Sequence, residues 1–206
     1  MGDCCNDKAC EIEALQQRQG ATLRLVLVIN AAMFAVELTA GLLSGSLSLL
    51  ADSLDMLGDA LVYGFSLYVV ARGARMKAFA ALSKGAVMAA FGLFVLGQAV
   101  YKVVYPQVPG FETIGLVGLA ALAANGLCLA LLWRHRGDDI NMRSVWLCSR
   151  NDIIANVSVL CAAAGVWLTQ SAWPDILVGL AIAGLFLRSA LSVLRDARAE
   201  LQAAHG

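Results

Sequence analysis

Six apolar stretches separated by short polar segments dominate the sequence. Each is about 20 residues long, which is the length that an α-helix needs to cross the hydrocarbon core of a bilayer. The predicted spans are 23–43, 48–70, 79–101, 113–133, 146–168 and 175–194. The pattern predicts an all-α membrane protein with six transmembrane helices. The six-helix transmembrane transport domain is predicted to cover residues 21–195, between a cysteine-containing tail at 1–20 and a short tail at 196–206.

Composition agrees with this prediction and excludes other classes of protein. Of the 206 residues, 60% are hydrophobic and 15% are charged, whereas about a quarter of the residues in a soluble domain are charged. The 15 basic and 15 acidic residues balance, so the net charge gives no reason to expect a nucleic-acid partner. The expected partner of most of the surface is the lipid bilayer.

The basic residues predict the orientation of the helices. Ten Lys and Arg residues lie in the two tails and in the second and fourth connections, whereas the other three connections hold one, Lys102. Connections rich in Lys and Arg stay on the cytoplasmic side of a membrane. Both termini are therefore predicted to be cytoplasmic, in a multi-pass protein of the cell (inner) membrane.

Acidic residues in the second span are the first candidates for function. Asp52, Asp55 and Asp59 share one face of a helix, because 3.6 residues complete a turn. An ionisable group inside a span costs about 3 kcal/mol on insertion scales and is a functional candidate by default. We interpret Asp55 and Asp59 as ligands of a cation. For Asp52 we favour a cap at the outer end of the second helix, with lining of the ion pathway as the alternative.

The fifth span carries a second polar stripe, in which Cys148, Asp152 and Asn156 follow one another at four-residue spacing. A thiolate and a carboxylate on adjacent turns can hold one metal ion. Together with the two aspartates of the second span they make four ligands, the number that zinc-type ions favour. Magnesium and calcium prefer all-oxygen ligands and cuprous copper prefers sulfur, so the set indicates zinc or cadmium.

The two pairs can meet only if the fifth helix begins earlier than its apolar stretch, near Asp139 or Asn141. The same four ligands suggest how transport is driven. Three carboxylates and a thiolate carry four negative charges, and a divalent ion cancels half of them. Because an empty, fully ionised site would be very unfavourable, protons are expected to replace the departing ion. The chemistry predicts metal–proton antiport.

Other polar residues and thiols are secondary candidates. Three cysteines near the N-terminus could capture a soft metal on the cytoplasmic side, although a tail with no set role is the alternative. We interpret the cysteines of the fourth span and of the opposite face of the fifth as packing residues. The capture candidates are Cys4, Cys5 and Cys10, the packing cysteines are Cys128 and Cys161, and the pathway candidates besides Asp52 are Asn30, Glu37, Asn125 and Asn156.

These features resemble the cation diffusion facilitator family of metal–proton antiporters. The resemblance runs from about Leu23 to Leu201 and is carried by LADSLDMLGDA in the second span and SVWLCSRNDIIANVSVL in the fifth. Family members place a His/Asp-x-x-x-Asp pair in each of these spans and bind the transported ion there. Position by position, the implied ligands are Asp55, Asp59, Cys148 and Asp152.

The resemblance also implies a function and an assembly. It implies export of zinc, cadmium, cobalt or a similar ion from the cytoplasm in exchange for protons, by a homodimer without a prosthetic group. Cys148 stands where zinc-selective members commonly have His, so a preference for softer ions is expected. Many members carry a soluble C-terminal metal-sensing domain, and the sequence ends about where it would begin. We therefore expect a short form.

Two other classes of function fit part of the pattern. A membrane metal sensor or metal-delivery protein would explain the N-terminal thiols equally well without transport. A membrane enzyme that binds a divalent metal on clustered aspartates is the third class. Such enzymes follow a D-x-x-D-G-x-x-A-R pattern, but no Asp-Gly or Ala-Arg follows in register here. We expect a transporter rather than an enzyme.

Overall fold

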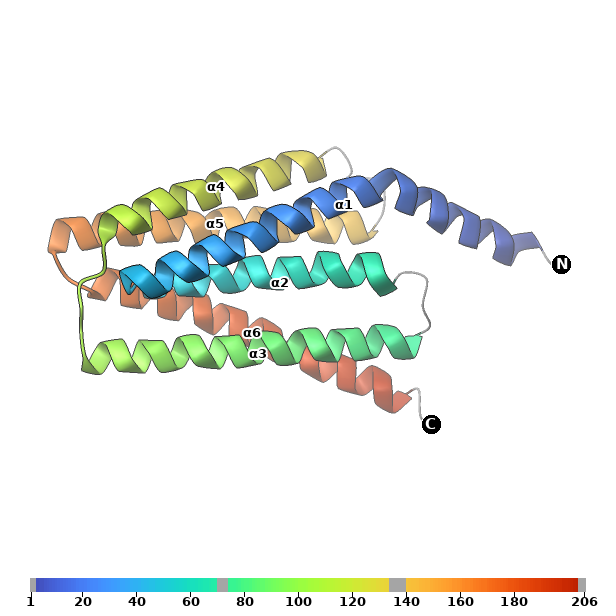
Figure 1. Ribbon diagram of the computed structural model, residues 1–206. Helices are drawn as coiled ribbons and strands as arrows, with labels where there is room; N and C mark the ends of the chain where they lie inside the picture. Colours follow the sequence, from blue (N-terminus) through green and yellow to red (C-terminus); the bar gives the residue numbers. More distant parts are fainter. Residues whose placement is uncertain (1–2, 70–73, 134–139, 204–206) are drawn as a thin grey trace.

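Six helices form the described part of the chain in a computed structural model (Figure 1). The backbone is described for residues 3–69, 74–133 and 140–203, and the side chains for most residues of 20–64, 82–133 and 152–195. The helices are α1 (Asp3–Ser44), α2 (Leu47–Val69), α3 (Ala74–Val104), α4 (Phe111–Trp133), α5 (Ile140–Thr169) and α6 (Trp173–Ala203). The described residues contain no strand, so the predicted all-α class is confirmed.

The helices run up and down in one bundle, with both chain termini at the same end (Figure 1). Helix α2 lies inside this bundle, because it packs against α1, α3, α5 and α6. Two further pairs, α3 with α6 and α4 with α5, complete the walls. The central position of α2 buries the polar face that carries its aspartates.

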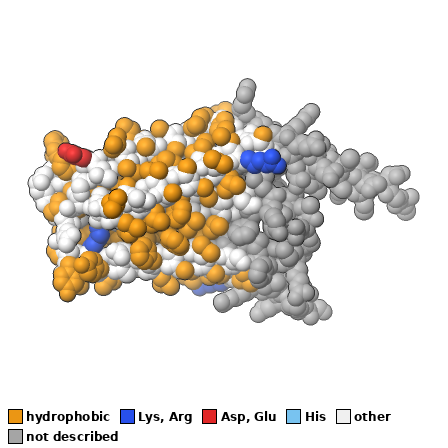
Figure 2. All heavy atoms as spheres, viewed as in Figure 1, with side chains coloured by type: hydrophobic (Ala, Val, Ile, Leu, Met, Phe, Trp, Pro, Cys, Tyr) orange, Lys and Arg blue, Asp and Glu red, His pale blue; other side chains and the backbone are white. Residues whose placement is uncertain are grey.

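The described surface is that of a multi-pass membrane protein. On the described part of the visible face, hydrophobic side chains are spread widely and few charged side chains interrupt them (Figure 2). Among the described residues, four segments are long and apolar enough to cross a bilayer: Gly20–Ser44, Gly85–Val104, Phe111–Leu131 and Asp152–Thr169. Helix α2 is not one of these four segments. Its three aspartates within eight residues lower its mean hydropathy.

Several helices extend beyond the apolar stretches in the sequence, including α6, which ends at Ala203. Helix α5 begins at Ile140, six residues before its apolar stretch, as the proposed ligand set required. Helix α1 begins at Asp3, twenty residues before the predicted span at 23. Residues 3–20 include two Ala, two Glu, three Gln and one Leu, which favour helix, but the segment is too polar to indicate a membrane span. The division of the chain at residue 20 stays a prediction.

Glycines allow close contact between the helices, as is common in membrane bundles. Gly179 of α6 faces the start of α2, where an added Cβ atom would come within 2.7 Å of the carbonyl carbon of Leu47. On α3, Gly85 and Gly92 accommodate leucine side chains of α6 in the same way. Because the neighbour of Gly179 is backbone rather than a flexible side chain, this contact cannot relax easily.

We therefore expect Gly179→Ala to lower the free energy of unfolding by about 1–3 kcal/mol through overpacking. Gly184→Ala is the matched control on the same helix, since nothing lies within 4 Å of an added Cβ atom there. That control should be neutral or slightly stabilising, because Ala favours helix over Gly. Denaturation of the purified protein in mixed micelles measures both. Equal stability of the two variants would contradict the packing described at α2 and α6.

Candidate metal centre

The acidic face of α2 points into the bundle. Asp52 is buried, while Asp55 and Asp59 are half-buried one and two turns further along the helix. The hydroxyl of Tyr63 donates a hydrogen bond to Asp59 Oδ2 at 3.2 Å. The i, i+4 spacing thus places Asp55, Asp59 and Tyr63 along one line of the helix surface.

Helix α5 brings a fourth carboxylate to this face. The carboxyl groups of Asp59 and Asp152 lie within hydrogen-bonding distance of each other, and Asp152 also experiences the negative charges of Asp55 and Asp52. Two carboxylates in such contact repel each other when both are ionised, and a shared proton or a bound cation relieves that repulsion. The pairing across α2 and α5 creates a strongly negative region that favours cations.

Several predicted ligands lie outside the described side chains. Cys148 belongs to α5, one turn before Asp152, and the side chains of Cys4, Cys5 and Cys10 belong to the first part of α1; none of these four is described. Within the described side chains, no group of three or more His, Cys, Asp or Glu residues is arranged to hold a metal ion. The four-ligand set and the capture role of the N-terminal thiols stay predictions.

A chain of amide hydrogen bonds fixes the orientation of Asp52. Asn156 of α5 donates from Nδ2 to Asp52 Oδ2 at 2.7 Å, and Asn125 of α4 donates from Nδ2 to Asn156 Oδ1 at 2.8 Å. The prediction that Asp52 caps α2 is wrong, because the helix already begins at Leu47 and the Asp52 side chain turns toward α5. Its role in lining a pathway, like that of both asparagines, stays a prediction.

The other two pathway candidates are buried on α1. Glu37 is 0% exposed, and neither of its carboxylate oxygens has a hydrogen-bond partner among the residues that the structure describes. Asn30 donates to the Val26 carbonyl oxygen at 2.9 Å and to the sulfur of Cys128 at 3.8 Å. Both side chains are buried in the interior of the bundle.

Cys128 lies closer to the acidic region than its interpretation as a packing residue suggested. Its side chain is buried beside Val26 and Tyr63, and its sulfur experiences the charges of Asp59 and Asp152. Sequence alone did not indicate this proximity, because no ionisable residue lies within one turn of Cys128 in α4. Cys161 is exposed on α5, away from this region.

A second polar cluster, at the opposite end from the termini, was missed in the sequence. Asp175, in the first turn of α6, is fully buried and accepts hydrogen bonds from both backbone and side chains at the start of α2. The donors are Leu47 N at 2.7 Å, Ser48 N at 3.0 Å, Ser46 Oγ at 2.6 Å and Ser48 Oγ at 2.6 Å. Lys102 Nζ of α3 lies 3.9 Å from Asp175 Oδ2. Asp175 therefore caps α2 from another helix. In the sequence, the serines at the start of α2 were the signal that could have indicated a polar cluster at this helix end.

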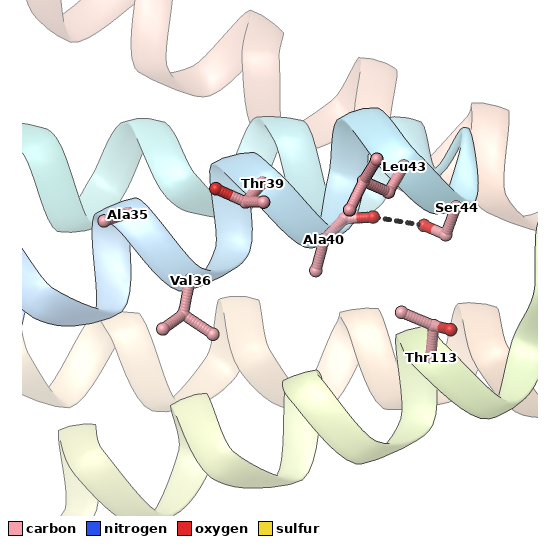
Figure 3. Close-up of a pocket in the computed structure, with 7 residues that line it drawn as sticks. All are labelled: Ala35, Val36, Thr39, Ala40, Leu43, Ser44 and Thr113. Atoms are coloured by element: carbon pink, nitrogen blue, oxygen red, sulfur yellow. Dashed lines mark hydrogen bonds between the residues drawn. The ribbon is translucent and has the colours of Figure 1, made fainter.

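A groove between α1 and α4 has different chemistry (Figure 3). It has a volume of about 620 Å³, and small or apolar side chains form most of its lining. The lining residues are Ala35, Val36, Thr39, Ala40, Leu43, Ser44 and Thr113. The one hydrogen bond drawn there joins Ser44 Oγ to the Ala40 carbonyl oxygen at 2.7 Å (Figure 3). No charged side chain lines the groove, so it suits lipid chains rather than an ion.

Comparison with known proteins identifies the family. A family profile described as the cation efflux transmembrane domain matches residues 23–202. The chain belongs to the cation efflux family. The match confirms the resemblance to the cation diffusion facilitators, and the family and its named relatives are transporters rather than enzymes.

Relatives within the cation efflux family carry names that refer to metal ions. The chain is 30% identical over 189 residues to the zinc transporter ZitB of Pectobacterium atrosepticum, covering 84% of this chain and 58% of the relative. It is 26% identical over 201 residues to ZitB of Yersinia pestis, covering 90% and 64%. It is 25% identical over 199 residues to the cadmium, cobalt and zinc/H(+)-K(+) antiporter of Bacillus subtilis, covering 86% and 63%. The chain thus spans about three fifths of the length of these relatives.

Proposed function

We propose that this chain is a divalent heavy-metal efflux transporter of the cell (inner) membrane. Its substrates are ions of the zinc and cadmium class, with cobalt as a further candidate, and protons move in the opposite direction. The observation that carries the proposal is the contact between the carboxyl groups of Asp59 and Asp152, which joins α2 and α5 at a buried acidic region. The family of the chain and the names of its relatives support the same class of substrate.

In the proposed site, Asp55 and Asp59 of α2 and Cys148 and Asp152 of α5 bind the ion together. Three oxygens and one sulfur give the tetrahedral set that zinc and related ions accept. In the absence of metal, a proton shared between Asp59 and Asp152 relieves their repulsion. An arriving cation takes over that role and displaces the proton, and the reverse step on the other side of the membrane releases the metal. This competition for the same carboxylates couples the two flows.

Two further parts of the proposal concern capture and assembly. Cys4, Cys5 and Cys10 would bind soft metal ions at the cytoplasmic end, where thiols stay reduced. The family resemblance implies a homodimer, which we include in the proposal. The distribution of Lys and Arg supports a cytoplasmic position for both termini. The two termini also lie at the same end of the bundle (Figure 1).

Reconstitution into liposomes with an imposed pH gradient tests the proposed function. We expect zinc or cadmium uptake, followed by an internal metal dye, together with opposite proton movement followed by an internal pH dye. Collapse of the gradient with a proton ionophore is the control and should abolish concentrative uptake. Stoichiometric metal binding without flux would contradict transport and would favour the metal sensor or delivery protein instead.

Cys148→His should change which ion is preferred. Replacing the proposed thiolate with imidazole removes the soft ligand, so the ratio of cadmium to zinc transport should fall by roughly ten-fold. Competition between the two ions in the liposome assay measures this ratio. Cys161→Ala is the control, since this exposed cysteine lies elsewhere on α5 and should leave the ratio unchanged. An unaltered ratio in Cys148→His would show that Cys148 is not a ligand.

A further inference from the structure

Within the described part of the chain, three buried carboxylate oxygens have no hydrogen-bond partner, and they belong to neighbouring helices. They are Oε1 and Oε2 of Glu37 on α1 and Oδ1 of Asp52 on α2. Glu37 is 0% exposed and Asp52 is 1% exposed. Most buried polar atoms in proteins are hydrogen-bonded, so each exception calls for an explanation such as a bound ion.

The connection between α1 and α2 brings these two residues to the same depth. Helix α1 ends at Ser44, and Gly45 turns the chain with a φ of 65°, a left-handed conformation that suits glycine. Glu37 precedes Gly45 by eight residues and Asp52 follows it by seven. At 1.5 Å per residue, both side chains lie roughly 10–12 Å from the turn along antiparallel helices. The Glu37 carboxylate accordingly experiences the charges of Asp52 and Asp55.

The amide chain leaves one oxygen of Asp52 available. Asn125 donates to Asn156 Oδ1, which directs the Asn156 amide nitrogen toward Asp52 Oδ2. No described residue donates a hydrogen bond to Asp52 Oδ1. The described neighbours of Glu37 supply further negative charge, from Asp52 and Asp55, rather than a cation. Two buried carboxylates on packed helices, one of them oriented by Asn156, therefore present oxygens without hydrogen-bond partners among the described residues.

We propose that Glu37 and Asp52 form a second binding site for a divalent cation, built only from oxygen ligands. Two carboxylates balance the charge of one divalent ion, and oxygen ligands suit ions such as manganese as well as weakly held zinc. The site lies between the Asp59–Asp152 contact and the α1–α2 turn, which is at the end of the bundle opposite the termini (Figure 1).

The role of this second site rests on the proposed function, although its existence does not. In a transporter that moves metal away from the termini, the ion would pass from a site with a thiolate to a site with oxygen ligands alone. A soft ion binds more weakly to the second site, which favours its release. Asn156 contributes by positioning Asp52 rather than by binding the ion.

Manganese binding by the purified full chain tests the second site. The Asp59→Asn, Asp152→Asn double variant disables the proposed transport site, and its manganese binding is followed by electron paramagnetic resonance. We expect this variant to retain one bound manganese ion per chain, and we expect the further change Glu37→Gln to weaken binding by about ten-fold or more, as loss of a metal ligand should. Glu112→Gln, at an exposed acid in the first turn of α4, is the matched control. Absence of manganese from the double variant, or equal affinity after Glu37→Gln, would overturn the proposal.

A ligand exchange separates loss of the site from loss of the fold. In the same double variant, Asp52→Cys should raise the ratio of cadmium to manganese affinity by about ten-fold or more, because sulfur prefers the softer ion. An unfolded protein would not show such a gain, and an unchanged ratio would overturn the proposal. If the unaltered chain transports metal but these variants show no second site, only this inference fails. If the second site binds manganese but the unaltered chain gives no flux, only the proposed function fails.

Discussion

Asp59→Asn is expected to reduce metal flux in liposomes by on the order of 100-fold or more, since residues that merely support metal ligands already change affinity by about 10–100-fold. The substitution preserves the size of the side chain and its capacity to accept a hydrogen bond from Tyr63. It removes the charge that binds the cation, and it replaces the carboxyl partner of Asp152 with an amide. The proton and the metal would then no longer compete for the same pair of groups.

The flux experiment needs a second acidic variant and a control for folding. Asp152→Asn should reduce flux to the same extent, and the double variant should lose little more than either single variant, because residues that act as a unit are not additive. Glu112→Gln should transport like the unaltered chain, because this exposed acid lies in the first turn of α4. Flux within a few-fold of normal in Asp59→Asn would exclude a direct role for the Asp59–Asp152 pair.

Asp175→Ala should have the largest effect on stability, at about 3–5 kcal/mol, the usual cost of removing one partner of a buried charged pair. The change removes the acceptor for two backbone N–H groups and two hydroxyl groups at the start of α2. It also leaves Lys102, 3.9 Å from the carboxylate and buried, without its counter-charge. The α2 helix would lose its cap as well as its connection to α6.

Denaturation in mixed micelles measures this effect, and a double-variant cycle apportions it. Asp175→Asn should be less damaging than Asp175→Ala, since an amide oxygen can still accept hydrogen bonds from the serines. Combining Asp175→Asn with Lys102→Met should cost less than the sum of the two single changes, because no charge then stays unpaired. If Asp175→Ala lowered the free energy of unfolding by less than about 1 kcal/mol, the cluster would contribute no more than an exposed ion pair does. That result would contradict its burial.

The helices could be predicted from the sequence to a large extent, because apolar length is a local property. Six stretches of about 20 residues became six helices, and the need for Asp152 to reach the depth of Asp59 predicted the early start of α5. The extension of α1 to Asp3 was not predicted, because a helix of polar residues does not produce an apolar stretch in the sequence. The helix propensity of residues 3–20 was the signal that could have indicated it.

The candidate site could be predicted most directly where both partners sit on one helix, whereas the hydrogen bonds of Asp52 and Asp175 to other helices were not expected. The four-residue spacing of Asp55 and Asp59 follows from helix geometry and was readable directly. The partners of Asp52 and Asp175 are more than 100 residues away in the sequence. Such contacts depend on how the helices pack, which is why Asp52 was mistaken for a cap while the actual cap, Asp175, was missed.

The most direct test of a shared ion site on α2 and α5 is X-ray absorption at the zinc edge. The sample is the zinc-loaded full chain with Cys4, Cys5 and Cys10 replaced by Ser, so that the thiols of α1 do not contribute. The account predicts one sulfur at about 2.3 Å and oxygen ligands at about 2.0–2.2 Å, with the sulfur signal lost in Cys148→Ala. A zinc site without sulfur, or one unchanged by Cys148→Ala and Asp152→Asn, would contradict it.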